Sequence, residues 1–193
     1  MKKIILKIMS IIGVAAFSIL SSPLLAVSQA AGPAEQPKTV AAFEDRVKQY
    51  VKLREKIEEA MPNLSKEAKP EEIEAHKKAF QEKVRAARTG AKLGDVFTPD
   101  IISHIRATLK REFKGKDLKD LRETVLEAET KGVPVRINYP YPANKELVEM
   151  PPTLLLALPQ LPKQVRYRYV GNHLLLVDRE NGLIVDYMVN ALP

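Results

Sequence analysis

The sequence predicts an α+β fold in which four helices come first and a three-stranded antiparallel meander closes the chain. Apolar residues recur at intervals of three and four between about residues 40 and 129, which is helical spacing. Seven of the 14 prolines lie between residues 132 and 162, a density that excludes a long helix there. From Val165 onward, alternating apolar residues and two glycine-containing turns indicate strands.

We expect one folded domain behind an export signal. A signal peptide covers residues 1–30, a flexible lead-in covers 31–38, and a single α+β domain covers 39–193. The domain consists of a helical part at 39–130, a proline-rich connector at 131–164 and a β-meander at 165–190.

The first thirty residues have the layout of a secretory signal. A positive start is followed by an apolar run over residues 8–20, and the small residues Ser28 and Ala30 precede the expected cut. We therefore expect cleavage after Ala30 and an exported protein, periplasmic or secreted, with no stable membrane insertion afterwards.

The alternative for this segment is a retained membrane anchor. Residues 8–27 approach the ~20 residues that span a bilayer. Pro23 and the small residues at the exit favour cleavage.

The charge balance argues against a nucleic-acid partner. The full chain has a net charge of +7, and three of its 31 Lys and Arg residues lie in the expected signal. The mature chain would then hold 28 basic and 24 acidic residues, a net charge of +4. These charges are interleaved, as in "KLREKIEE", whereas a phosphate-binding surface gathers positive charge on one face. Because cysteine is absent, burial alone must stabilise the domain.

The first two expected helices carry narrow apolar stripes. The first ends at Pro62, and the second opens at Pro70 with Gly90 in the position of a C-terminal cap. Such stripes pair with each other or with a second copy of the protein, which predicts a monomer or a homodimer through this helical hairpin. The stripes are Phe43, Val47, Tyr50, Ile57 and Met61, then Ile73, Phe80, Val84 and Ala87.

Two shorter helices are expected next. Thr98 is a natural N-cap, Pro99 suits the first helical position, and Gly115 ends the run. Asp117 starts the fourth helix. The inner faces are Ile102, Ile105, Leu109 and Phe113, then Leu118, Leu121, Val125 and Leu126. In the connector only "VPVRINY" and "TLLLAL" suit a strand or a short buried element.

The closing meander has one apolar face. A Gly171-Asn172 turn pairs Val170 with His173. One face then holds Val165, Tyr167, Tyr169, Leu174 and Leu176, and the other holds Arg166, Arg168, His173, Leu175 and Val177. The second face would be partly covered, or would receive a partner.

The second turn allows two registers. A two-residue Asn181-Gly182 turn adds Leu183, Val185, Tyr187 and Val189 to the apolar face, whereas a three-residue loop brings Asp186 there. A slip of one residue inverts the faces of a strand. We expect the first register, because it keeps one face wholly apolar apart from Asp178 at its end. Asp178 and Asp186 then lie on opposite faces.

The stretch "VGNHLLLVDRENGLIVD", residues 170–186, resembles the C-terminal hairpin of small periplasmic proteins of nickel and cobalt homeostasis. The family's aromatic lead-in, often with Trp, is absent from this chain. The resemblance implies an envelope protein and carries no functional residue to this sequence.

Motifs for chemistry are missing. His76, His104 and His173 lie on separate elements without a second ligand at metal spacing. Ser103 and His104 are neighbours on a helix, so their side chains diverge, and no serine sits in a nucleophile elbow. Acidic pairs such as Glu58-Glu59 and Glu71-Glu72 are typical of solvated helix faces. We therefore assign no catalytic, cofactor-binding or metal-binding residue.

These observations favour an exported, non-catalytic protein that acts through protein–protein or envelope contacts. A periplasmic metal-binding protein and a hydrolase with a dispersed site are the alternatives.

Overall fold

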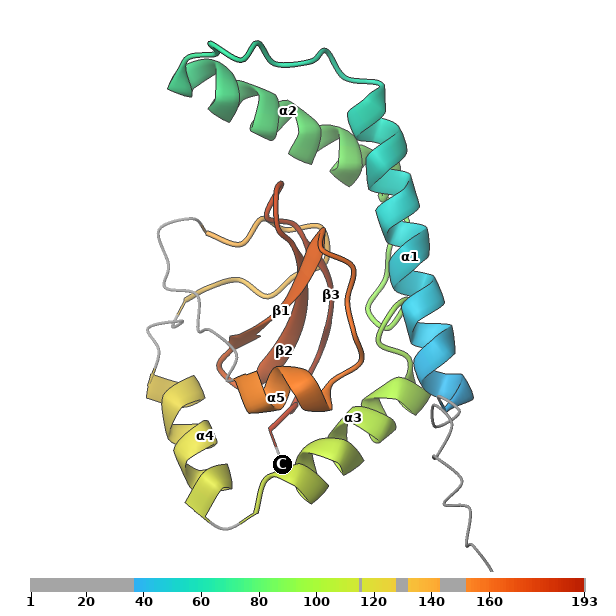
Figure 1. Cartoon of the computed structure of the whole chain (residues 1–193), viewed down its shortest axis with the longest axis vertical. Helices are drawn as coiled ribbons and strands as arrows, with labels where there is room; N and C mark the ends of the chain where they lie inside the picture. Colours follow the sequence, from blue (N-terminus) through green and yellow to red (C-terminus); the bar gives the residue numbers. More distant parts are fainter. Residues whose placement is uncertain (1–36, 115, 128–131, 143–151, 193) are drawn as a thin grey trace, which may run out of the picture. The chain divides into compact units, whose positions relative to one another are not determined.

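Among the described residues, five helices precede three strands in the computed structural model (Figure 1). The structure describes residues 37–114, 116–127, 132–142 and 152–192, so the expected signal peptide lies outside it. The predicted α+β class is confirmed: the four expected helices come first, and the antiparallel sheet has the order β1-β2-β3. A fifth, short helix lies between them in the proline-rich connector. The elements are α1 (Lys38–Glu59), α2 (Pro70–Ala87), α3 (Pro99–Glu112), α4 (Lys116–Glu127), α5 (Pro152–Ala157), β1 (Val165–Val170), β2 (His173–Asp178) and β3 (Ile184–Met188).

The hairpin of β1 and β2 has the predicted register. Val170 pairs with His173, so Gly171 and Asn172 form a two-residue turn. Gly171 has a φ of +50°, a left-handed conformation that most side chains disfavour, which explains the glycine at this position.

Between β2 and β3, residues 179–182 form a loop that is closed by Asp178 and Leu183 and is longer than either predicted turn. The N–H of Asp178 donates to the carbonyl of Leu183 at 3.0 Å, and the N–H of Gly182 donates back to the carbonyl of Asp178 at 3.1 Å. Gly182 has a φ of +71°, so a glycine is again favoured where the chain turns back.

A bulge in β3 combines the two predicted registers. Val177 pairs with Ile184, but Leu176 pairs with Asp186, so Val185 is inserted into the ladder. Val185 keeps the apolar face of the preferred register. Asp186 instead follows the alternative register, because the inserted residue moves the rest of the strand by one position.

The preferred register is therefore wrong beyond the bulge. Tyr187 packs on the second face rather than the first. Met188 replaces it on the first face, in the main core, which is the larger cluster of buried residues shared by the sheet and the helices. Val189, also expected on the apolar face, is 42% exposed.

The first face of the sheet packs beneath the helices in the main core. Tyr167, Leu176 and Val185 are at most 3% exposed and belong to one cluster, as predicted. Side chains from α1, α2, α3, α4 and α5 belong to this cluster as well. The sheet is thus covered by the N-terminal segments of its own chain, which removes a large apolar surface from water.

The second face is covered by the connector. The N–H of Tyr141 donates to the carbonyl of Gly182, and the N–H of Ile184 donates to the carbonyl of Tyr139. Pro140 forms an isolated antiparallel bridge with Leu183, the residue before β3. The bridge lies at a sheet edge, where the missing N–H of proline is tolerated. Val133, Tyr141, Val170, Leu175, Val177 and Ile184 form this second cluster.

Helices α1 and α2 contact each other only through part of α2. Phe43, Val47 and Tyr50 of α1 are buried as predicted. In α2, Phe80 and Val84 are buried, but Ile73 is 46% exposed, contrary to its expected place on the inner stripe. The N-terminal half of α2 therefore projects beyond the main core.

Helices α3 and α4 begin close to their expected positions. Ile105 and Leu109 are fully buried, but Ile101 rather than Ile102 is the first core residue of α3. In α4, Val125 is fully buried and Leu126 is 55% exposed, so the predicted inner role of Leu126 is wrong.

The apolar run "TLLLAL" forms α5 instead of a strand, which corresponds to the short buried element expected as one option. Leu154 and Leu158 are buried in the main core, whereas Leu155 and Leu156 point outward. None of the helices in the described part of the chain combines the length and apolar character needed to cross a bilayer.

Candidate binding cleft

The 179–182 loop is held in place by the carboxylate of Asp178. Its Oδ1 accepts the N–H groups of Glu180 at 2.9 Å and Asn181 at 3.1 Å. An aspartate that binds the backbone two residues further on stabilises a turn. The loop is therefore rigidly attached to the end of β2.

The same carboxylate connects the loop to α1. Its Oδ2 accepts the hydroxyl hydrogen of Tyr50 at 2.7 Å and lies 3.0 Å from Nε of Arg54. Arg54 also pairs with Glu180 and, at 3.3 Å, with Glu58. Asp178 is fully buried and Arg54 is 3% exposed. These charges are stabilised because each has an opposite partner and directed hydrogen bonds.

Asp186 attaches β3 to the loop before α3. Its carboxylate accepts backbone N–H groups from Gly94 at 3.2 Å, Val96 at 2.8 Å and Phe97 at 2.8 Å. Gly94 has a φ of +90°, which lets this loop curve around the carboxylate. The bulge makes this contact possible, because without the inserted Val185 the side chain of Asp186 would lie on the other face of the sheet.

Arg88 bridges the helices and β3 beside these carboxylates. Its guanidinium donates to Oδ1 of Asn138 at 2.6 Å and to the carbonyl of Val185 at 2.8 Å. It also lies over the ring of Tyr50, 5.0 Å from the centroid. Burial lowers the pKa of Arg88, and the nearby Tyr50 and Asp186 oppose this shift.

Burial and the charge of Asp178 raise the pKa of Tyr50 well above its ordinary value of 10.0. Burial likewise raises the pKa of Tyr167 and Tyr169. The neutral phenols are therefore favoured in the folded state. Their contribution to stability is complete below pH 10 and is lost as the pH rises above it, because only the unfolded chain then releases the protons.

We expect the Tyr50→Phe variant to lose stability less steeply at alkaline pH than the parent protein. Above pH 10 each buried tyrosine makes the free energy of unfolding fall by about 1.4 kcal/mol per pH unit, and the variant lacks one of these groups. Urea unfolding, followed by far-ultraviolet circular dichroism across this pH range, measures the slope. Equal slopes for the two proteins would contradict the expectation, and Tyr139→Phe, at a half-buried tyrosine, is the control.

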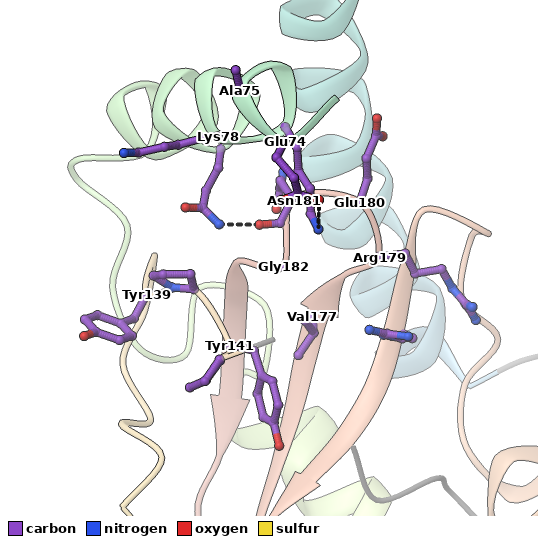
Figure 2. A pocket seen from close by; sticks show the side chains of 15 residues that line it. Glu74, Ala75, Lys78, Tyr139, Tyr141, Val177, Arg179, Glu180, Asn181 and Gly182 are labelled. Carbon is purple, nitrogen blue, oxygen red and sulfur yellow. Dashed lines mark hydrogen bonds and ion pairs between the residues drawn. The ribbon is translucent and has the colours of Figure 1, made fainter. Parts of the chain in front are cut away.

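An open cleft lies between α2, the 179–182 loop and the connector (Figure 2). Its volume is about 730 Å³, within the range typical of ligand sites. Figure 2 shows Lys78 of α2 across the cleft from Tyr139 and Tyr141, with Val177 on the sheet and Arg179 on the loop. The two tyrosines and Val177 provide apolar surface within a largely polar rim.

The two sides of the cleft are joined where α2 meets the loop. Nε2 of Gln81 donates to the backbone carbonyl of Asn181 at 2.5 Å. Arg54, which holds the loop through Glu180, also lies over the ring of Phe80, 4.9 Å from its centroid. The cleft is thus closed at the end where α2 contacts the loop. The N-terminal half of α2 forms an exposed wall of the cleft.

Positive charge predominates in the cleft. Among the described residues that line it, four are cations, Lys77, Lys78, Arg166 and Arg179, and two are carboxylates. Both carboxylates already have partners within the protein, Glu180 at Arg54 and Glu74 at Lys77. Burial lowers the pKa of Arg166, as does the nearby positive charge of Arg179.

The histidines considered from the sequence remain apart. His76 contacts the carbonyl of Pro62 at 3.1 Å, His104 is half-buried on α3, and the ring of His173 lies 6.1 Å from that of Tyr187. Within the described residues no group of three or more metal-ligating side chains comes together.

The serine and the helix carboxylates have local partners. The hydroxyl of Ser103 donates to the carbonyl of Pro99, one helical turn earlier, rather than to His104. Glu72 accepts the N–H of Lys69 at 2.8 Å at the start of α2, which stabilises the helix end.

The expectation that Asp178 and Asp186 lie on opposite faces is wrong. Both are fully buried on the first face, because Asp178 pairs across from Val165 and the bulge turns Asp186 to the same side. The backbone N–H groups that they accept belong to different loops, and Asp178 also binds Tyr50 and Arg54 of α1.

Comparisons with family models, curated proteins and solved structures give no match to this chain. Of the residues that line the cleft, Arg166 and Val177 were placed by the sequence on the second face, which was expected to be partly covered or to receive a partner. No role was assigned from the sequence to Lys78, Tyr139 or Tyr141. Adjacent lysines at 77 and 78, together with tyrosines among the connector's prolines, were the available signals.

Proposed function

We propose that this is an exported, non-catalytic binding protein whose cleft receives an acidic, extended segment of a partner protein. The observation that carries the proposal is the lining of the cleft. Its described cations outnumber its described carboxylates, and both of these carboxylates are already paired within the protein. Acidic side chains of a partner would neutralise Lys78, Arg166 and Arg179.

The tyrosines that line the cleft favour a protein as the partner. Tyr139 and Tyr141 line the cleft together with arginines, and tyrosine and arginine are the residue types that dominate the binding energy of protein interfaces. Lys78 and Arg179 are exposed, so the site opens to solvent and a chain can pass along it. The partner segment would place apolar side chains against the tyrosines and acidic ones along the rim.

Export is a separate part of this proposal. It is supported by the signal-like sequence at residues 1–30. Mass spectrometry of the protein recovered from the cell envelope and the medium tests it, with an N-terminus at Ala31 expected. Recovery of an intact chain from the cytoplasm alone would contradict export.

The cleft is tested with fluorescently labelled peptides that alternate glutamate and valine. Fluorescence anisotropy should detect binding that weakens as salt is added, because screening reduces the attraction between exposed charges. A peptide that alternates lysine and valine should not bind. Equal binding of the two peptides would contradict the proposal.

We expect the Lys78→Glu/Arg179→Glu variant to bind the acidic peptide about tenfold more weakly or worse, because two attractive contacts become repulsive. The control is Lys83→Glu/Arg85→Glu, which makes the same change in net charge at exposed positions of α2 outside the cleft. An equal loss in both variants would show that only net charge matters and would refute a specific site.

A further inference from the structure

Helix α5 exposes two leucines to solvent, although the helix itself packs against the main core. Leu154 is fully buried and Leu158 is 4% exposed, so the helix is fixed to the main core. Leu156 is nevertheless 87% exposed and Leu155 is 46% exposed. Apolar side chains held outward on a rigid element are typical of a contact surface.

A second, smaller cleft adjoins α5 at the first of these leucines, Leu155. It has a volume of about 300 Å³ and lies between the residues that follow α5 and strand β1. Leu155 is at its edge. Its charged lining residues are all cations, Lys163, Arg166, Arg168 and Arg179, and none of the described residues that line it is a carboxylate.

Two of the positive charges in this small cleft, Arg166 and Arg179, repel each other. Arg166 is partly buried, and both burial and the proximity of Arg179 lower its pKa. The Nε of Arg166 is buried without a hydrogen-bond partner among the described residues. A ligand that carries a phosphate group would relieve the repulsion and accept hydrogen bonds from a guanidinium.

We propose that α5 and this cleft form a docking surface for a membrane that contains anionic phospholipid. Leu155 and Leu156 enter the boundary between headgroups and acyl chains, and the cations bind the phosphate groups beside them. Apolar insertion next to positive charge is the combination by which proteins attach to anionic bilayers without spanning them. An acidic protein segment matches the cations but provides no apolar phase for a leucine as exposed as Leu156.

The experiment measures co-sedimentation of the purified protein with two kinds of vesicle. One kind contains phosphatidylcholine alone, and the other contains phosphatidylcholine mixed with phosphatidylglycerol. All variants share the same N-terminal segment, so its contribution cancels between them. We expect binding to the mixed vesicles and little binding to phosphatidylcholine alone. Equal binding to both would overturn the proposal.

Two variants test the residues that belong to this surface and not to the larger cleft. Leu155→Ser/Leu156→Ser should weaken vesicle binding by about tenfold or more, since insertion depends on buried apolar area. Its matched control is Leu64→Ser/Leu93→Ser, two other exposed leucines. Lys163→Glu should also weaken binding, whereas Lys83→Glu should not.

The same variants distinguish this inference from the proposed function. Leu155→Ser/Leu156→Ser should retain the affinity for the acidic peptide, and Lys83→Glu/Arg85→Glu should retain vesicle binding. If the leucine variant loses peptide binding and keeps vesicle binding, α5 is a protein-binding surface and the membrane proposal is wrong. Circular dichroism of each variant verifies that the fold is intact.

Discussion

Replacing Asp186 by alanine is expected to lower the free energy of unfolding by about 3–5 kcal/mol, because buried backbone donors lose a charged acceptor. The carboxylate accepts N–H groups from Gly94, Val96 and Phe97, and its side chain is fully buried. Such a loss is a large fraction of the total stability of an ordinary domain. Urea unfolding followed by circular dichroism measures it.

Two further variants make this measurement specific. Asp186→Asn keeps one oxygen acceptor but no charge, so we expect a loss smaller than that of the alanine variant. Asp45→Ala removes an exposed aspartate that pairs with Lys48, at 3.3 Å, and should cost less than about 1 kcal/mol. If Asp186→Ala costs no more than Asp45→Ala, the carboxylate does not hold the loop before α3.

The second large effect is expected at Asp178, where alanine should cost about 3–5 kcal/mol. The change removes the buried partner of Arg54 and the acceptor for both Tyr50 and the loop N–H groups. Arg54→Met should cost less, since Asp178 keeps its hydrogen bonds to Tyr50 and to the loop. Urea unfolding of the two single variants and the double variant gives the coupling energy.

The coupling should be about 1–3 kcal/mol, because the two side chains form one buried network. Losses that simply add would mean that the ion pair contributes nothing specific. The Asp178→Ala variant should also bind the acidic peptide more weakly, because Asp178 fixes the loop that carries Arg179. Unchanged affinity in a folded variant would separate the network from the cleft.

Sequence alone determined the order of the elements and most of their positions. Pro70 and Pro99 begin helices α2 and α3 as expected, because proline has no N–H to lose at a helix start. The Gly171 turn and the face of Tyr167 follow from alternation and turn chemistry. These features depend on neighbours in the chain, so local pattern is sufficient to predict them.

Tertiary structure decided where the polar groups lie. Two readings of the second turn were possible, and the bulge at Val185 selected a mixture of both. Asp186 faces the helices because the N–H groups of Gly94, Val96 and Phe97, about ninety residues earlier in the chain, donate to its carboxylate. No local pattern indicates such a partner.

The candidate cleft belongs to the same class of feature. Its cations come from α2, from β1 and from the loop after β2, segments that approach one another only in the folded chain. Sequence spacing reports periodicity within one element, whereas a site assembled from three elements depends on how they pack. Hydrophobic burial places those elements, and the buried carboxylates then hold the loops that line the cleft.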